Sequence, residues 1–218
     1  MFDLRAYEGL ARTRYVLDAS CVTAATLASM ATVTGTGAVG LSTLNVPGGR
    51  INLTTSTNDT AEVKLPVRFG NSGGSVAAWA VEVEGLRTNG LRSEVALEIS
   101  EANGSGTGLL WNNSGIAVST TTGVTTPTLQ AGNFRNMDDI RAGVLVEVPG
   151  GTSSAFATGY VGGTLARTAT GVHASGFLSP RIRVAGSYDA AAASVVSFRR
   201  LTLTCIWGTA GGPITKVL

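Results

Sequence analysis

The stretch Ser75-Val-Ala-Ala-Trp-Ala-Val-Glu-Val-Glu84 carries the clearest structural signal in the chain. Successive side chains of a β-strand point to opposite faces, so Trp79 and the two valines after it share an apolar face, while both glutamates lie on the other. The segment from Val95 to Ile99 alternates in the same way. Between the two lies Asn89-Gly90, a pair that favours a tight reversal of the chain. We therefore predict a β-hairpin from Ser75 to Glu101, whose apolar face needs a second sheet to cover it.

Short alternating segments recur along the chain and are separated by Gly, Pro and Asn turn signals. The clearest of them are Tyr15–Val22, Arg50–Thr54, Ala61–Phe69, Ala142–Val148, Pro180–Val184 and Val195–Trp207. This pattern predicts an all-β fold, an antiparallel β-sandwich of the jelly-roll type. The expected core comprises Trp79, Val81, Val83, Val95, Leu97, Ile99, Leu201, Leu203 and Cys205.

A chain of 218 residues fits one large sandwich domain with arms. We place the sandwich at residues 15–208, an extended or short helical N-terminal arm at 1–14, and a C-terminal tail at 209–218. The segment Thr23–Leu44 is rich in threonine and glycine and is predicted to be strand and loop.

Charged residues make up only 14% of the chain, about half the usual share of about 25%. So few charges leave little to keep a bare surface dispersed in water, which favours a subunit covered by copies of itself and other partners. The two arms carry apolar side chains with no core left to join, so they are the expected assembly contacts. These side chains are Phe2, Leu4, Tyr7 and Leu10 at one end and Ile214, Val217 and Leu218 at the other.

The start of the chain lacks the basic segment and apolar run of a secretory signal, so synthesis in a cytoplasm is expected. The uncharged stretch from Ala19 to Gly49 is too rich in Thr, Ser and Gly for a membrane span. The net charge is +2, and the arginines of the last third are dispersed, so we expect no nucleic-acid partner. Cys21 and Cys205 are the only cysteines, and two buried free thiols or a disulfide both fit their apolar contexts.

No residue pattern predicts catalysis, a metal or a cofactor. His173 is the only histidine and stands in a Gly/Ala/Ser stretch without a nucleophile motif. The spacing of Glu82 and Glu84, and of Glu94 and Glu98, permits a glycosidase carboxylate pair, but acids on the outward face of amphipathic strands explain them as well. The chain is therefore expected to be non-enzymatic.

Sugar binding is the favoured small-ligand hypothesis. Trp111 is followed by Asn112 and Asn113 where a predicted strand enters a loop. An exposed indole can stack on a sugar ring while neighbouring amides bind its hydroxyls, so these three residues are the predicted sugar site.

The Trp79 strand, the Leu110-Trp111-Asn112 turn and the closing segments Arg181–Gly186 and Val196–Thr204 resemble the jelly roll of carbohydrate-binding modules, over residues 61–207. The Gly/Thr/Ala-rich, charge-poor style resembles virion proteins of tailed bacteriophages, particularly minor tail and receptor-binding proteins. Together these resemblances imply a non-enzymatic virion subunit, a minor tail protein made in the host cytoplasm that assembles with copies and neighbouring virion proteins. The alternatives are a capsid decoration protein, a module that binds host cell-wall glycans, and a glycan-cleaving enzyme.

Overall fold

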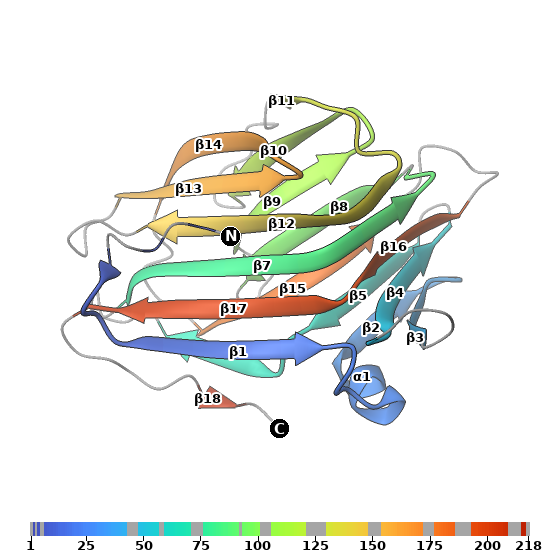
Figure 1. Ribbon diagram of the computed structural model, residues 1–218, viewed down its shortest axis with the longest axis horizontal. Helices are drawn as coiled ribbons and strands as arrows, with labels where there is room; N and C mark the ends of the chain where they lie inside the picture. The colour runs from blue at the N-terminus through green and yellow to red at the C-terminus, as the bar shows by residue number, and fades with distance from the viewer. Residues whose placement is uncertain are drawn as a thin grey trace.

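The protein is a sandwich of two antiparallel β-sheets with one short helix at its end (Figure 1). The computed structural model describes residues 2, 4, 7–42, 48–56, 59–70, 76–91, 93–100, 106–120, 130–147, 154–171, 177–185, 193–208 and 215–216. Within these residues each sheet has nine strands. The predicted all-β sandwich is therefore confirmed.

Sheet A faces the viewer in Figure 1 and runs in the order β14-β13-β12-β7. The long strand β7 then pairs with β17 over its first part and with β16 over its second; β17 continues to β1, and β16 continues to β4 and β3. Its strands are β1 (Arg12–Asp18), β3 (Ala38–Ser42), β4 (Arg50–Thr55), β7 (Val76–Asn89), β12 (Met137–Glu147), β13 (Ser154–Val161), β14 (Thr164–Gly171), β16 (Ser194–Phe198) and β17 (Arg200–Trp207).

Sheet B lies behind it in the order β11-β10-β9-β8-β15-β5-β2, and β6 joins β15 to β18 (Figure 1). Its strands are β2 (Ala31–Thr34), β5 (Thr60–Lys64), β6 (Val67–Gly70), β8 (Glu94–Ser100), β9 (Gly106–Asn112), β10 (Gly115–Thr120), β11 (Gln130–Ala131), β15 (Phe177–Ala185) and β18 (Thr215–Lys216).

The predicted hairpin is wrong, because its two arms lie in different sheets. Strand β7 belongs to sheet A and pairs with β12, β16 and β17, whereas β8 belongs to sheet B and pairs with β9 and β15. The residues after Glu84 continue β7 as far as Asn89, and Leu86 and Thr88 are both buried there. The chain reverses at Gly90, which has the positive φ of 59° that the Asn-Gly pair predicted. The reversal therefore carries the chain across the core rather than back along the same sheet.

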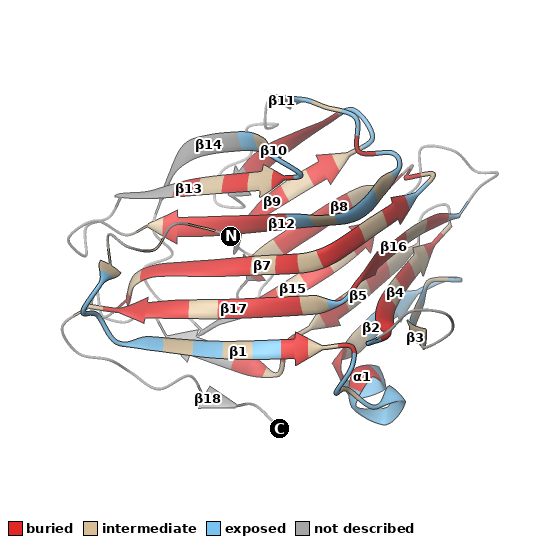
Figure 2. Ribbon diagram, in the orientation of Figure 1, coloured by how far each residue is buried: buried red, intermediate tan, exposed pale blue. Residues whose placement is uncertain are grey.

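The core between the sheets contains every side chain that the alternation predicted (Figure 2). All nine predicted core residues are at most 1% exposed. Trp79 comes from the middle of sheet A and Leu97 from sheet B, and both belong to one continuous cluster of buried side chains. The inward parity assigned to Trp79 is confirmed.

Helix α1 (Ala24–Met30) lies within a segment predicted to be strand and loop, so this prediction is wrong. The Thr23 side chain caps the helix by accepting a hydrogen bond from the Thr26 amide at 3.1 Å, and alanine, leucine and methionine dominate the turn that follows. Leu27 and Met30 are buried and anchor the helix on the main core. The packing of Leu27 and Met30 and the Thr23 cap thus stabilise a helix although the threonines around it favour strand.

Both cysteines are free thiols: Cys205 is buried and Cys21 is exposed. Burial raises the pKa of the Cys205 thiol. Strand β1 begins at Arg12, slightly before the predicted domain start, and its pairing with β17 brings the two ends of the sandwich together. No helix in the described ranges is long and apolar enough to cross a membrane.

Candidate functional site

The outer face of sheet A is divided into an apolar half and a polar half. The apolar half is formed by four buried side chains: Ala78, Ala80, Leu145 and Ile206. Three half-buried side chains of the N-terminal arm pack over them: Phe2, Leu4 and Tyr7. Tyr7 also donates a hydrogen bond from its hydroxyl to Glu147 Oε1 at 2.9 Å, and burial is the main cause that raises its pKa.

Three of the predicted assembly contacts lie in this packing. Phe2, Leu4 and Tyr7 are half-buried and pack on the chain's own sheet, and whether they also contact a neighbouring subunit stays a prediction. Leu10 is 37% exposed. The other three predicted contacts, Ile214, Val217 and Leu218, lie outside the described residues.

The polar half carries a row of alternating charges across four adjacent strands. The backbone register places Asp18 of β1 opposite Arg200 of β17, Arg200 opposite Glu84 of β7, and Glu84 opposite Arg141 of β12. Opposite charges directly across a strand pair each contribute about 0.2–1 kcal/mol. We call these four residues the charged row.

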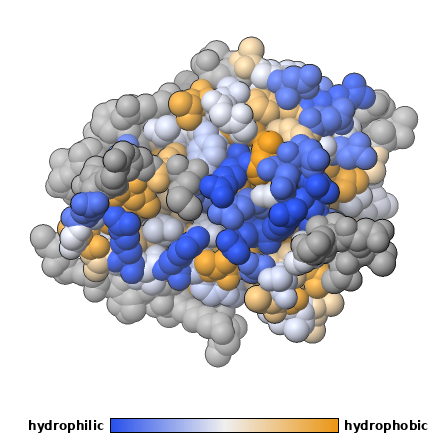
Figure 3. Space-filling model, viewed as in Figure 1, coloured by the Kyte–Doolittle hydropathy of each residue, from blue (hydrophilic) through white to orange (hydrophobic). Residues whose placement is uncertain are grey.

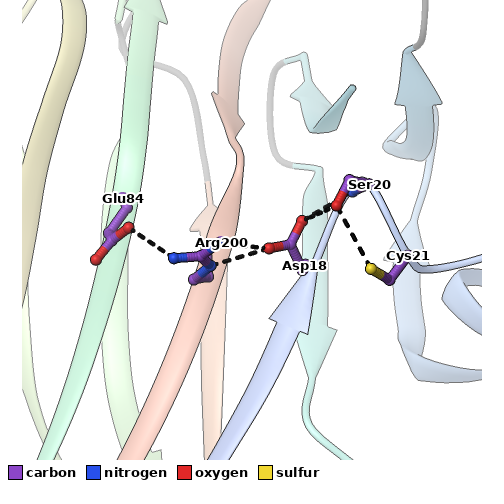
Figure 4. Close-up of polar contacts among 5 residues, drawn as sticks. All are labelled: Asp18, Ser20, Cys21, Glu84 and Arg200. Atoms are coloured by element: carbon purple, nitrogen blue, oxygen red, sulfur yellow. Dashed lines mark hydrogen bonds and ion pairs between the residues drawn. The ribbon is translucent and has the colours of Figure 1, made fainter. Parts of the chain in front are cut away.

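Arg200 is the centre of the charged row (Figure 4). Its Nε and Nη2 donate to Asp18 Oδ2 at 3.0 and 2.8 Å, and its Nη1 donates to Glu84 Oε2 at 3.3 Å. The other oxygen of Asp18 accepts hydrogen bonds from the Ser20 hydroxyl at 2.6 Å and the Ser20 amide at 2.9 Å. The Ser20 hydroxyl, followed by the Ser20 amide and Arg200, lowers the pKa of Asp18, and Asp18 in turn raises the pKa of Arg200. Asp18 and Arg200 are thus fixed in their charged forms.

A polar cleft of about 360 Å³ opens above the charged row. Its lining residues are Asp18, Ser20, Gly48, Glu84, Gly85, Asp139, Arg141, Arg199 and Arg200. Hydrophilic side chains gather on this face of the molecule (Figure 3). The cleft lies within the range of about 300–1,000 Å³ of small-molecule sites, but its lining is polar where most such sites are apolar.

The base of the cleft is held by a buried arginine. Arg50 is 3% exposed; its Nη1 donates to the carbonyl of Gly85, and its Nη2 donates to Asp139 Oδ1 at 3.1 Å. Arg199 lies 3.5 Å from the same carboxylate oxygen. Burial, followed by Arg87 and Arg199, lowers the pKa of Arg50.

Backbone conformation shapes this end of the cleft. Gly85 has a φ of 64°, and a Cβ there would lie 2.8 Å from the Arg199 side chain, so only glycine lets that side chain cross β7. Asp139 has a φ of 55°, a conformation that is uncommon for a residue other than glycine and is often found at functional sites.

Three groups in the cleft keep hydrogen-bonding capacity within the described part of the chain. Glu84 Oε1 and Asp139 Oδ2 accept no hydrogen bond there, and the exposed Arg141 guanidinium has neither a hydrogen bond nor an ion pair. The cleft therefore offers both acceptors and donors to a bound molecule.

An aromatic pair closes the polar half on the side of the N-terminal arm. Phe2 meets Tyr160 edge to face, with ring centroids 5.0 Å apart, and the Tyr160 hydroxyl donates to Glu82 Oε1 at 3.0 Å. Burial and then the Glu82 charge raise the pKa of Tyr160. Gly143 of β12 lies between Tyr160 of β13 and Glu82 of β7. A Cβ on Gly143 would be 2.9 Å from the Tyr160 ring and 3.1 Å from Glu82.

The predicted sugar platform is wrong. Trp111 is 0% exposed and belongs to the main core, because its position on β9 has inward parity between Val95 and Ile116. Asn112 accepts hydrogen bonds from the Ser114 and Gly115 amides, and Asn113 accepts one from the Ser114 hydroxyl. Both amides thus shape the β9–β10 turn.

Some residues of the cleft were recognisable from the sequence, but their position next to one another was not. Glu82 and Glu84 were correctly placed on the outward face of β7. Strand register, which is not readable from one strand alone, aligns Glu84 with Arg200, Asp18 and Arg141. His173 lies outside the described residues, and no group of three or more potential metal ligands occurs within them.

No family model matches the chain, and no curated protein is similar to it in sequence. Solved structures of lectins do share its fold. Peanut lectin, solved with a nine-residue peptide, is 11% identical, and the match covers 92% of this chain and 100% of that chain with a TM-score of 0.61. Arcelin-5, a lectin-like defence protein from Phaseolus vulgaris, is 8% identical over 90% of this chain and 99% of its own, with a TM-score of 0.62.

The carbohydrate recognition domain of Emp47p is also similar, with 13% identity, coverage of 80% of this chain and 87% of that chain, and a TM-score of 0.54. Identities this low show the fold alone. They bear out the β-sandwich part of the sequence resemblance, whereas the virion part rests on sequence style.

Proposed function

We propose that the protein is a non-enzymatic carbohydrate-binding module and that the cleft above the charged row holds the sugar. The observation that carries this proposal is a cleft of about 360 Å³ lined by ordered carboxylates and guanidinium groups on a lectin-like sandwich. Sugar hydroxyls both donate and accept hydrogen bonds, so they need both kinds of partner at fixed positions.

The charged row supplies these partners without rearrangement. Arg200 is held by Asp18 and Glu84, which keeps in place the Glu84 carboxylate that lines the cleft. A group that is already ordered loses little entropy on binding, which favours affinity. The polar lining also selects a hydroxyl-rich ligand over an apolar one.

A glycan array probed with the whole protein tests the proposal. Glycans that bind wild type should lose most of their signal with Glu84→Gln, which weakens both the hold of Arg200 and the acceptor in the cleft. Arg14→Gln is the matched control, because Arg14 is exposed on the same strand as Asp18 but does not line the cleft. Absence of any bound glycan, or equal loss with Arg14→Gln, would contradict the proposal.

The charge-poor composition favours a second candidate function, a virion subunit. In this role the sandwich packs against copies of itself and neighbouring proteins, as a minor tail protein or a capsid decoration protein, in a virion assembled after synthesis in the host cytoplasm. A receptor-binding module on a virion would combine both functions. Mass spectrometry of purified phage particles tests it: the chain should be present in a fixed ratio to the other structural proteins.

A further inference from the structure

The charges around the cleft do not balance. Counting the described side chains that line the cleft or lie directly beneath it, there are four arginines and three carboxylates. The arginines are Arg50, Arg141, Arg199 and Arg200, and the carboxylates are Asp18, Glu84 and Asp139. A polar cleft with an excess positive charge attracts anions, since the surrounding protein focuses the field into it.

The excess is located at Arg141. Arg200 is held between Asp18 and Glu84 at 2.8–3.3 Å, and Arg50 and Arg199 share the Asp139 carboxylate. Arg141 is exposed and has no carboxylate in contact among the described residues, although Glu84 lies opposite it on the next strand.

Glu84 does not neutralise Arg141 because Arg200 draws it to the other side. Glu84 Oε2 accepts from Arg200 Nη1 at 3.3 Å (Figure 4), so within the described residues this carboxylate pairs with Arg200 and not with Arg141. The guanidinium fork of Arg141 can therefore donate two parallel hydrogen bonds to a planar or tetrahedral anion.

We propose that the cleft binds an acidic saccharide whose anionic group pairs with Arg141 while ring hydroxyls bind Glu84. This inference rests on the proposed function and narrows it to a ligand class, sugars that carry a carboxylate or a sulfate. Both anions present two oxygens at the spacing of a guanidinium fork. Arg199 also lines the cleft and adds positive potential over the same volume.

The neighbouring arginines make this preference stronger than one exposed charge would. Arg50 is buried, and its carboxylate partner, Asp139, is shared with Arg199. The Arg50 Nε has no hydrogen-bond partner among the described residues. Its charge is screened less than that of an exposed group, so it contributes to the field in the cleft at a longer range.

The test uses the full chain on an array of matched glycan triplets: an acidic oligosaccharide, its carboxyl-reduced neutral form, and the O-sulfated neutral form. Affinities for the best triplet are then measured by titration calorimetry. Wild type should bind the acidic form at least about tenfold more tightly than the neutral form. Arg141→Gln should reduce that difference to about twofold or less, and Arg14→Gln should leave it unchanged.

The outcomes separate the inference from the proposed function. Equal binding of acidic and neutral forms overturns the acidic preference but leaves sugar binding intact. If Arg141→Gln still binds the acidic form as much more tightly than the neutral form as wild type does, Arg141 is not the residue that binds the anion. Binding of the sulfated form with the same dependence on Arg141 supports recognition of the anion itself, whereas a preference for the carboxylate alone supports a uronic-acid or similar ligand. No bound glycan on the array overturns both proposals.

Discussion

Replacing Trp111 with alanine should lower the free energy of unfolding by about 3 to 5 kcal/mol, the usual loss for a large buried aromatic side chain. A buried aromatic removes about 150–250 Å² from water, which at about 25 cal/mol per Å² corresponds to about 4 to 6 kcal/mol. Trp111 is fully buried in the main core, so it should lie within this range.

Replacement of Trp111 with phenylalanine should cost far less. The indole Nε1 is buried without a hydrogen-bond partner among the described residues, and such a group costs about 1 to 3 kcal/mol. The smaller ring loses about 2 kcal/mol of burial, so the two effects nearly cancel and the net change should stay within about 1 kcal/mol.

Trp207 is the matched control. It is also buried, at 2% exposure, but its Nε1 donates to the Thr13 hydroxyl at 2.8 Å. Trp207→Phe therefore loses a hydrogen bond as well as burial and leaves the Thr13 hydroxyl without its donor. It should be more destabilising than Trp111→Phe by about 1 to 3 kcal/mol.

Urea unfolding followed by far-ultraviolet circular dichroism measures all three variants without depending on tryptophan fluorescence. A loss of less than about 1 kcal/mol for Trp111→Ala would show that the ring is accessible and would restore it as a sugar platform. Equal losses for Trp111→Phe and Trp207→Phe would refute the assignment of an unpaired indole in one position and a paired one in the other.

Three further outcomes follow from the outer face of sheet A. The folded state lowers the pKa of Asp18, so the contribution of Asp18 to stability is complete above the unfolded pKa of about 3.9 and is lost as the pH falls through the lower folded pKa. In urea titrations, Asp18→Asn should therefore lose less unfolding free energy than wild type between neutral pH and pH ~3. Deleting residues 1–10 should uncover the apolar half around Leu145, lower stability by about 2 to 4 kcal/mol and increase binding of a hydrophobic dye, whereas an unchanged melt would mean that the arm adds nothing to this face. The purified protein should hydrolyse no glycan that it binds; turnover that disappears in Glu82→Gln or Glu84→Gln would show instead that these carboxylates are catalytic.

The alternation of apolar side chains was sufficient to predict the sandwich and its core, because period-two burial is a property of each strand alone. Trp79 and Leu97 point inward as their parity requires. Pairing was not predictable in the same way. The Asn89-Gly90 reversal suits a hairpin, yet here it joins the two sheets, since Leu86 and Thr88 continue β7 as buried strand residues.

The candidate site was less predictable than the core for a related reason. Each member of the charged row is an ordinary outward polar residue of its own strand, and Asp18 and Arg200 are 182 positions apart in sequence. Only the pairing of β1 with β17, and of β17 with β7, makes them neighbours. The prediction for Trp111 was wrong because an aromatic before two asparagines has the composition of a sugar platform, while its parity on β9 points it into the core.

One structural cause explains why the outer face of sheet A has both a covered and an open half. Phe2, Leu4 and Tyr7 pack over the outward apolar side chains of β7 and its neighbours, and the Phe2 amide donates to Glu82 Oε1 at 3.3 Å, at the first carboxylate of the strand. Beyond that point the outward residues of β7 are charged or polar, and an apolar cover over Glu84 would remove its open oxygen from water without a partner. The outward residues of the strands that build the core thus divide this face into an apolar half, on which Phe2, Leu4 and Tyr7 pack, and a charged half, where the cleft lies.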